Sequence, residues 1–451
     1  MRHGGIRLAW IQAAPGARVP SLHQPTSRTE QHVDQGRPVP RRRDVLGEPG
    51  PRRALRRQRQ PRAAVGPAHP AQRRGVHRQR RRRHEAAPEA ARRRAAPGPV
   101  TVPTELPPPP LGSFASDNAA GVSPEVLAAL VAANEGPALA YGEDPWTAEM
   151  VAAFRDLFDA PVEVLVGWGG TGANVFGLAS LLQPWQSVLC TDTAHIVVDE
   201  CGAPARFTGS AITPVPHVDG KLEVAAVAPF LHWLGTEHHV QPRVLSISQV
   251  SEMGTVYSVD EIAALCDFAH ANGLLVHLDG ARIANAVVAT GADVRTMLRD
   301  AGVDVLTFGL TKDGAMYGES VVYLRPELAE HARFVRKQAG QLPSKARFVS
   351  AQVTALLADE LWLRNAEHAN AMARRLAELV ADVPGVRVPR PPEANSLFVQ
   401  LPPEKIRPLQ DWSFFWEWDL SQDMVRWMTS FATTDDDLDR FAAGVRAVLA
   451  G

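Results

Sequence analysis

The stretch 274-LLVHLDGAR-282 decides the fold class of this chain. Its first half, Leu274–Leu278, is a short apolar run that we interpret as a buried β-strand, and the strand ends at Asp279. Comparable apolar runs occur on both sides of it in the sequence, and they alternate with amphipathic helical stretches. Short apolar strands separated by helices indicate an α/β fold with a mostly parallel sheet covered on both faces.

On both sides of this stretch, the sequence predicts a folded part that begins near Leu111 and has two regions with different patterns. Between Leu111 and about 382 the pattern predicts strands at 162–168, 187–191, 243–248, 274–279, 304–308 and 320–324, and helices at 124–134, 146–158, 172–182, 259–271, 326–339 and 347–382. Beyond 385 it predicts a small α+β domain, with strands at 386–388, 396–401 and 425–431 and a helix at 434–449. The aromatic residues of segment 402–424 are expected in the core of that domain: Trp412, Phe414, Phe415, Trp416 and Trp418.

The first hundred residues differ from the rest in charge. They hold 24 arginines, no lysine and six acidic residues, whereas residues 101–451 hold 24 basic and 43 acidic residues. Residues 1–110 also contain 18 of the 37 prolines and lack apolar periodicity. They cannot bury enough surface to offset the entropy of ordering, so we predict a disordered extension. One interpretation is that this segment is translated from DNA upstream of the true start codon, which would give such a composition. The alternatives are a flexible arm, a targeting segment and a nucleic-acid-binding arm.

Composition and length exclude several classes of protein. Three cysteines in 451 residues exclude a multi-disulfide framework and fit a reducing compartment. No apolar run approaches the roughly 18 residues of a membrane span, and the N-terminus lacks the order of a secretory signal. We therefore expect a cytoplasmic protein without membrane contact, for which nucleic acid is an unlikely partner and no metal site is predicted.

Ligands of open α/β sheets bind beyond the carboxyl ends of the strands, and four predicted strand ends carry candidate residues. The first is followed by 169-GGTGAN-174 and a helix, a sequence suited to a phosphate. The others are followed by His195, with Glu200 five residues on, by Asp279 and by Lys312. Each has an ordinary interpretation on its own: a tight turn, a surface histidine, a helix N-cap and a solvated lysine.

Together these four features match the chemical needs of a pyridoxal phosphate site. The lysine amine forms a Schiff base with the cofactor, and the aspartate keeps the pyridine nitrogen protonated. The glycine-rich turn binds the phosphate, and a planar side chain stacks on the ring. The order along the chain (glycine turn, histidine, aspartate, lysine) also fits a single sheet.

At this level of detail the chain from about Ser113 to Leu449 resembles the fold-type-I pyridoxal phosphate enzymes of the threonine aldolase and β-eliminating lyase family. Within that family it is most similar to low-specificity L-threonine aldolases and phenylserine aldolases. The resemblance is carried by the stretches 114-FASDNAAG-121, 141-YGEDPWTA-148, 170-GTGAN-174, 194-AHIVVDECGAP-204, 254-GTVYSVDEI-262, 276-VHLDGARIANA-286, 308-FGLTKDG-314, 338-QAGQLPSKARF-348 and 394-ANSLFVQL-401.

The resemblance implies a fold, a cofactor and an activity. The fold is a large domain at 111–365 with a mostly parallel seven-stranded sheet, followed by a small α+β domain at 366–451. The cofactor is pyridoxal 5′-phosphate, and the reaction is cleavage of L-threonine, L-allo-threonine or another β-hydroxy-α-amino acid to glycine and an aldehyde. Phenylserine cleavage, β-elimination and racemisation are alternatives on the same cofactor, and a non-enzymatic role of the basic arm is a remote one.

Site roles follow from the same resemblance. Lys312 is implied as the Schiff-base lysine, Asp279 as the partner of the pyridine nitrogen, Gly170 and Thr171 as phosphate ligands, and His195 as the stacking residue and base. The substrate carboxylate is assigned to Arg282 and Arg426 with Ser116, because guanidinium groups bind carboxylates bidentately. Residues expected to reach a neighbouring subunit's site, in a homodimer or homotetramer, are Tyr141 and Lys345 or Arg347.

One stretch departs from the family pattern. Many threonine aldolases carry a second histidine after the strand that precedes the aspartate-bearing one, but this chain has 247-ISQVSEMG-254 at that place. A mechanism that needs two imidazoles is therefore in doubt, and His195 is left as the main candidate for the base.

Overall fold

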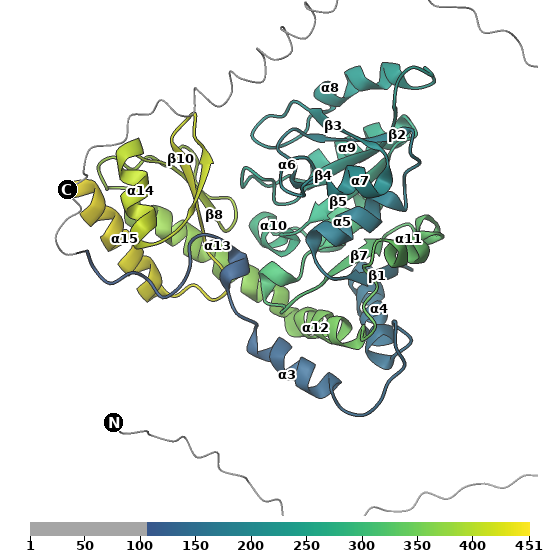
Figure 1. Cartoon of the computed structure of the whole chain (residues 1–451), viewed down its shortest axis with the longest axis horizontal. Helices are drawn as coiled ribbons and strands as arrows, with labels where there is room; N and C mark the ends of the chain where they lie inside the picture. Colours follow the sequence, from purple (N-terminus) through teal and green to yellow (C-terminus); the bar gives the residue numbers. More distant parts are fainter. Residues whose placement is uncertain (1–105) are drawn as a thin grey trace, which may run out of the picture. The chain divides into compact units, whose positions relative to one another are not determined.

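The computed structural model describes residues 106–451 (Figure 1). The predicted disorder of residues 1–110 therefore lies, except for its last five residues, outside the described part of the chain. Within the described part, no helix has both the length and the apolar character needed to cross a membrane. The same residues contain no group of three or more His, Cys, Asp or Glu side chains arranged to hold a metal ion.

A seven-stranded sheet forms the centre of the larger part of the structure. Its order is β1-β7-β6-β5-β4-β2-β3. Strand β7 runs antiparallel to both its neighbours, and all other neighbours in the sheet are parallel, which confirms the predicted mostly parallel sheet. The strands are β1 (Glu163–Gly167), β2 (Gln186–Thr191), β3 (Ala211–Val215), β4 (Gln241–Ser248), β5 (Leu275–Gly280), β6 (Val305–Phe308) and β7 (Glu319–Tyr323).

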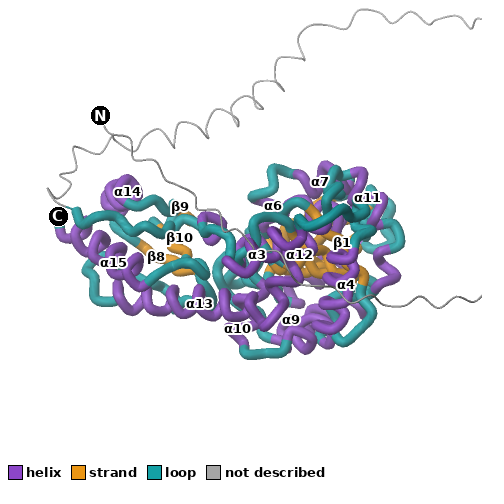
Figure 2. The backbone as a smooth tube through the Cα atoms, turned by 90° about the horizontal axis from the view of Figure 1, so that it is seen from below, coloured by secondary structure: helices purple, strands orange, loops and turns teal. Residues whose placement is uncertain are grey.

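Helices cover both faces of this sheet (Figure 2). Alternate residues of each strand join two separate apolar clusters: Leu189 and Leu306 pack on one face, Val188 and Val305 on the other. This is the burial expected of a parallel sheet, because successive side chains of a strand point to opposite faces. The covering helices are α3 (Pro124–Ala133), α4 (Pro145–Phe158), α5 (Gly170–Ala179), α7 (Ala203–Thr208), α8 (Val224–Val227), α9 (Val259–Ala271), α10 (Ile283–Thr290), α11 (Ala332–Gln338) and α12 (Arg347–Leu357).

Several predicted elements were wrong in detail. The predicted helix 347–382 is two helices, α12 and α13 (Leu361–Val380), because Asp359 and Glu360 adopt positive φ angles of 48° and 54° between them. The predicted helix 326–339 is divided into a short 3-10 turn, η5 (Pro326–Ala329), and α11. Strand β3 and helix α10 were missed.

The C-terminal part has its own sheet and core. The three-stranded antiparallel sheet has the order β8-β10-β9, with β8 (Ser396–Gln400), β9 (Trp416–Asp419) and β10 (Met424–Met428). Helices α13, α14 (Pro403–Trp412) and α15 (Asp435–Ala450) supply apolar residues to its core. Of the predicted strand 386–388, only an isolated bridge between Arg387 and Gln400 is present, and α14 and β9 were missed.

The N-terminal segment reaches this C-terminal core. Phe114 stacks on Phe441 with ring centroids 4.2 Å apart, and its carbonyl accepts a hydrogen bond from Met428 N. Helix α13 contributes Leu361 to the core of the large sheet and Leu376 to the core of the small one. The predicted boundary between residues 365 and 366 falls inside this helix, and it stays a prediction.

Candidate active site

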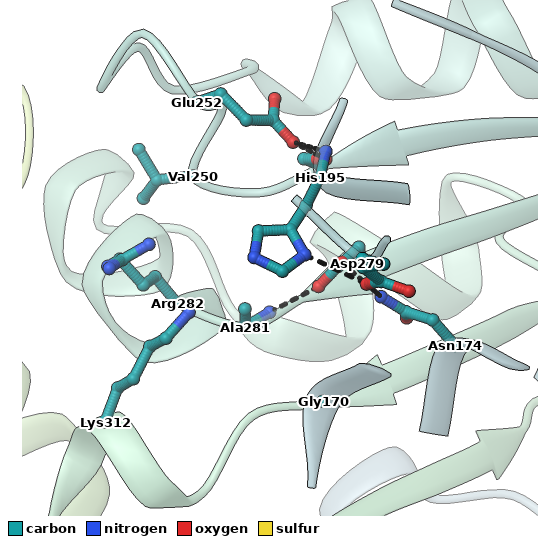
Figure 3. Close-up of a pocket in the computed structure, with 11 residues that line it drawn as sticks. Gly170, Asn174, His195, Val250, Glu252, Asp279, Ala281, Arg282 and Lys312 are labelled. Carbon is teal, nitrogen blue, oxygen red and sulfur yellow. Dashed lines mark hydrogen bonds and ion pairs between the residues drawn. The ribbon is translucent and has the colours of Figure 1, made fainter. Parts of the chain in front are cut away.

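Three predicted residues lie at the ends of the strands β5, β6 and β2 of the large sheet. Asp279 is near the end of β5, and Lys312 is in the short helix η4 (Thr311–Asp313) that follows β6. His195 is the first residue of α6 (His195–Val198), which follows β2. All three line one cavity of about 70 Å³, together with Gly170 and Asn174 (Figure 3). The glycine turn, His195, Asp279 and Lys312, which the sequence placed after four different strands, thus lie together at the carboxyl edge of the sheet.

Asp279 is buried and held by two donors. Its Oδ1 accepts a hydrogen bond from Ala281 N at 3.0 Å, and its Oδ2 accepts one from Nδ2 of Asn174 at 2.7 Å. Asn174 comes from α5, the helix that starts with the glycine turn. A buried carboxylate with two fixed donors is oriented before any ligand arrives.

The ring of His195 is oriented by Glu200. Nδ1 of His195 lies 2.9 Å from Oε1 of Glu200, which also accepts a hydrogen bond from Nδ2 of Asn174 at 2.9 Å. This hydrogen bond raises the pKa of His195, while burial opposes the rise and the charge of Asp279 adds to it. Nε2 of His195 has no hydrogen-bond partner among residues 106–451, so it is the ring nitrogen left for a ligand.

Lys312 is deeply buried among charged groups. Burial lowers its pKa, and the positive charge of Arg282 lowers it further, against the opposing charges of Asp117, Asp279 and Glu319. The result favours the neutral amine, which is the nucleophilic form.

Glu319 holds the turn that carries Lys312. Its Oε2 accepts a hydrogen bond from Leu310 N at 2.5 Å, and burial raises its pKa to about 7. The backbone before Lys312 is therefore fixed by the first residue of the adjacent strand β7.

The glycine turn opens helix α5. At Gly169 and Gly170 an added Cβ would meet no atom within 4 Å, so the space beside the first turn of the helix is open. Thr171 is the second residue of the helix. The first backbone N–H groups of a helix have no partner within it and carry the positive end of the helix dipole, which makes this turn suited to an anion.

A second cavity of about 360 Å³ adjoins the first and shares His195 and Lys312 with it. Ser116, Arg282 and Arg426 all line it, so the three predicted carboxylate ligands are together. Arg426 makes no ion pair among residues 106–451, and burial lowers its pKa to about 10. Its guanidinium lies 4.5 Å from the ring centroid of Trp418.

Arg282 lines both cavities but is already paired. Its Nε and Nη2 donate to the two carboxylate oxygens of Asp117 at 2.7 and 3.0 Å. Asp117 is almost completely buried and also accepts a hydrogen bond from Asn395 at 3.1 Å. Arg426 is thus the free guanidinium of the cavity, and Arg282 the engaged one.

The expectation for the aromatic segment 402–424 was partly wrong. Phe415 is fully buried in the small core as expected, but Phe414 and Trp416 are 51% and 53% exposed. Trp416 and Trp418 line the second cavity. The reason is register: Trp416 pairs with Arg426 across β9 and β10, so both side chains share one face of the small sheet.

The residues predicted to serve a neighbouring subunit do not line either cavity. Tyr141 is half exposed, has a φ angle of 64° and lies against Lys337, whose Nζ is 5.2 Å from its ring centroid. Arg347 packs on Trp146. The predicted role of Tyr141, Lys345 or Arg347 across an interface stays a prediction.

Sequence reasoning missed three residues of the site. Asn174 is four residues after Gly170, so its place on the same helix face was a usable signal. Asp117 lies within the matched stretch 114-FASDNAAG-121, but nothing in the sequence links it to Arg282. Glu252 lines both cavities and accepts hydrogen bonds from Ser248 and from the backbone of His195, which no local pattern predicts.

Comparison with known proteins identifies the relatives of this chain. A family model described as beta-eliminating lyase matches residues 113–402. A low specificity L-threonine aldolase from Pseudomonas aeruginosa is 42% identical over 339 residues, which cover 74% of this chain and 97% of that protein. A second protein of that name, from a Pseudomonas species, is 41% identical with the same coverage.

Solved structures agree with the sequence relatives. The structure of Leishmania major threonine aldolase matches with a TM-score of 0.70 and 30% identity, covering 75% of this chain and 99% of that one. An aspartate aminotransferase from Rhodobacter sphaeroides, at 17% identity and a TM-score of 0.58, shares the fold alone. The fold is that of the fold-type-I pyridoxal phosphate enzymes, and the chain belongs to the beta-eliminating lyase family.

Proposed function

We propose that this chain is a pyridoxal phosphate-dependent aldolase that cleaves L-threonine, L-allo-threonine or a related β-hydroxy-α-amino acid to glycine and an aldehyde. The observation that carries the proposal is the pair of adjoining cavities that share Lys312 and His195. One contains the residues that suit the cofactor, and the other contains a free guanidinium that suits an amino-acid carboxylate. The names of the Pseudomonas and Leishmania relatives support the reaction.

The residues present fit pyridoxal phosphate. The open space at Gly169 and Gly170 and the free N–H groups of α5 suit its phosphate. The oriented carboxylate of Asp279 suits the pyridine nitrogen, and the imidazole of His195 is a planar group that can stack on the ring. Lys312, a buried lysine with a lowered pKa, suits the aldehyde carbon.

When bound, the cofactor supplies an electron sink for the electron pair of the bond that breaks at the substrate α-carbon. Asp279 makes that sink effective by holding a proton on the pyridine nitrogen. Lys312 contributes an amine whose lowered pKa makes the neutral, nucleophilic form easier to reach, because burial disfavours the ammonium form.

His195 is the base in this proposal. Nδ1 is bound to Glu200, so Nε2 faces a ligand and can take the proton of the β-hydroxyl group. The imidazolium formed in this way is stabilised by Glu200, in the manner of a base oriented by a carboxylate. No second imidazole is needed for this step.

Arg426 binds the substrate carboxylate, with Ser116 as a second donor from the same cavity. Arg282, held by Asp117, is a fixed positive charge at the junction of the two cavities. Holding the carboxylate fixes the rotation about the substrate's α-carbon, which decides which bond is aligned for cleavage.

The assembly and setting of the protein belong to the same proposal. We expect a homodimer or homotetramer in which Tyr141 and Lys345 or Arg347 serve a neighbouring site, and a cytoplasmic location in keeping with three free cysteines. Two domains, at 111–365 and 366–451, follow the division between the two sheets.

The test is made on the purified full-length chain. Its absorbance with pyridoxal phosphate is recorded, and then L-threonine, L-allo-threonine and phenylserine are added while products are assayed. Glycine plus an aldehyde supports the aldolase, whereas a 2-oxo acid plus ammonia assigns the site to β-elimination. Lys312→Ala should lose both the cofactor absorbance and turnover, and Lys405→Ala, in the small domain, should lose neither. Full activity of Lys312→Ala would refute the site.

A further inference from the structure

Helix α6, which begins with His195, is too short to hold its own position without contacts to the rest of the chain. Helix α6 has four residues, and the N–H groups of a first turn have no partner within the helix. A single turn is also unfavourable without outside contacts, because its nucleation is costly. The position of the His195 ring must therefore be set by groups outside α6.

Two carboxyl groups hold His195 from opposite ends. Oε1 of Glu200 lies 2.9 Å from Nδ1 of the ring. Oε1 of Glu252 accepts a hydrogen bond from the backbone N–H of His195, also at 2.9 Å (Figure 3). The first contact sets the rotation of the ring, and the second sets where the backbone that carries it begins. Of the two, only Glu200 was visible in the sequence as a neighbour of His195.

The carboxyl group of Glu252 is arranged as an acceptor. Ser248 Oγ donates to the same Oε1 at 2.6 Å, so this oxygen has two donors. Oε2 is buried and has no partner within residues 106–451. Burial raises the pKa of Glu252, against the lowering effect of these hydrogen bonds.

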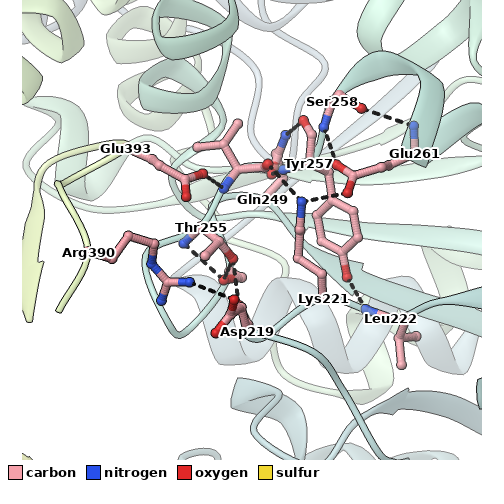
Figure 4. A network of polar contacts seen from close by, with 12 residues as sticks. Asp219, Lys221, Leu222, Gln249, Thr255, Tyr257, Ser258, Glu261, Arg390 and Glu393 are labelled. Atoms are coloured by element: carbon pink, nitrogen blue, oxygen red, sulfur yellow. Dashed lines mark hydrogen bonds and ion pairs between the residues drawn. The ribbon is translucent and has the colours of Figure 1, made fainter.

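The backbone on both sides of Glu252 is held by hydrogen bonds, which involve Gln249, Tyr257 and Glu393 (Figure 4). The side chain of Gln249 exchanges two hydrogen bonds with the backbone of Tyr257, at 2.9 and 3.0 Å. Val256 N donates to Oε2 of Glu393, from the segment that leads to β8, at 2.7 Å. Glu252 therefore reaches toward α6 from a backbone that is itself held at both ends.

We propose that Glu252 is a positioning residue for His195: it anchors the first N–H of α6 and so keeps the imidazole in the cavity between Lys312 and Glu200. It acts as a hydrogen-bond acceptor and needs no negative charge. The inference rests on the proposed function, because the aldolase reaction defines the task of His195. The segment 247–254, which lacks the second histidine of many relatives, would thus support the remaining one.

The test compares Glu252→Ala, Glu252→Gln and His195→Ala in the full-length chain loaded with pyridoxal phosphate. Glu252→Ala should lower kcat by roughly 10- to 100-fold with KM within about threefold, because the loss is in transition-state placement. Glu252→Gln keeps the acceptor and should keep kcat within about threefold. The visible circular dichroism of the bound cofactor should change in Glu252→Ala and in His195→Ala, but not in Glu252→Gln.

A double variant separates positioning from a general loss of structure. If Glu252 acts through His195, adding Glu252→Ala to His195→Ala should lower kcat no further, because the two changes share one effect. A multiplied loss would overturn the proposal, as would a Glu252→Gln variant as impaired as Glu252→Ala. Glu237→Gln, on the exposed surface, is the matched control.

Failure of the proposed function can be told apart from failure of this inference. A chain that binds pyridoxal phosphate but releases no glycine would refute the aldolase, while the dichroism still reports whether Glu252 orients His195. Unchanged dichroism in Glu252→Ala, with His195→Ala changed, would refute the positioning role whatever the reaction. If Glu252→Ala does not fold, normal kcat and dichroism of Glu252→Gln support the proposal, and their loss overturns it.

Discussion

Glu200 joins His195 to Asp279 through a single amide. Its Oε1 lies 2.9 Å from Nδ1 of His195 and 2.9 Å from Nδ2 of Asn174, and the same Nδ2 lies 2.7 Å from Oδ2 of Asp279. The proposed base and the proposed partner of the pyridine nitrogen are thus oriented by one buried chain of hydrogen bonds. Substitution of either middle residue, Glu200 or Asn174, should disturb this chain most, because each of them binds two neighbours.

The first prediction concerns pH. The hydrogen bond that His195 donates to Glu200 raises the pKa of His195 in spite of burial, and a base must be neutral to accept a proton. Activity should therefore rise with pH through this pKa. Glu200→Gln removes the carboxylate, so the pKa of His195 should fall and the acid limb of kcat/KM should move to lower pH. An acid limb that stays in place, or moves to higher pH, would contradict the assignment; Glu237→Gln serves as the control.

The sequence was sufficient to predict those strands and candidate residues for which burial or chemistry permits few residue types. The central strands were found because both their faces are buried and their apolar runs are continuous. Lys312, Asp279, His195 and Gly170 could be singled out as candidates because each lies at or after a strand end, at the edge where ligands bind, and the four line one cavity. Strand β3 was missed because it is an edge strand, exposed in part and interrupted by Pro214.

The sequence could not predict hydrogen-bond partners that are far apart in the chain and meet only through tertiary packing. Arg282 was assigned to a substrate carboxylate because nothing local indicates Asp117, which is 165 residues away in the chain. The contact between His195 and Glu252 spans 57 residues in the same way. The break at Asp359 was hidden because the amphipathic pattern continues from α12 into α13, and both helices place apolar residues in the core of the large sheet.

A second prediction concerns packing in the small domain. Gly444 lies in α15, where a Cβ would overlap the ring of Trp412, whose Nε1 is tied to the carbonyl of Pro107 at 2.8 Å. Alanine usually stabilises a helix interior by about 1 kcal/mol relative to glycine. Here Gly444→Ala should instead lower the free energy of unfolding by about 1–3 kcal/mol, because a fixed ring must move.

Urea denaturation measures this effect. Ala443→Gly, at the exposed neighbouring position of the same helix, is the control and should cost about 1 kcal/mol through propensity alone. A Gly444→Ala variant more stable than the parent chain would show that the ring of Trp412 moves aside without cost.

A third prediction concerns the buried pair of Asp117 and Arg282. Burial alone would raise the pKa of Asp117, but the charges of Arg282 and Lys312 and the Arg282 hydrogen bond outweigh it, so the pKa is lowered. Asp117→Asn leaves Arg282 without its counter-charge and should reduce the free energy of unfolding by about 3–5 kcal/mol at neutral pH.

The pH dependence of that loss has a definite sign. Because the folded pKa is below the unfolded value of 3.8, the stabilisation is fully present above that value and disappears as pH falls through the folded pKa. Denaturation without added cofactor should show a difference between parent and Asp117→Asn that is constant from neutral pH down to mildly acidic pH and shrinks only below. Asp156→Asn, on the surface, should show no such difference; a gap that narrows toward neutral pH would rule out the pairing as its source.

The last prediction separates the two arginines. Arg426 has no ion-pair partner in the described part of the chain and lines the larger of the two cavities, whereas Arg282 is paired with Asp117. Lysine cannot reproduce the two parallel hydrogen bonds of a guanidinium to a carboxylate. Arg426→Lys should therefore raise KM for L-threonine at least about 10-fold while leaving the affinity for pyridoxal phosphate unchanged.

Arg282→Lys should behave differently, because the guanidinium group of Arg282 binds Asp117 of the chain rather than the substrate. It should lower the free energy of unfolding as Asp117→Asn does, and Arg387→Lys, at an exposed position near β8, should change neither quantity. If Arg426→Lys kept its KM while Arg282→Lys raised it, the substrate carboxylate would have to displace Asp117 from Arg282. The second cavity, with Trp416 and Trp418 beside Arg426, would then face the aldehyde portion of the substrate and not its carboxylate.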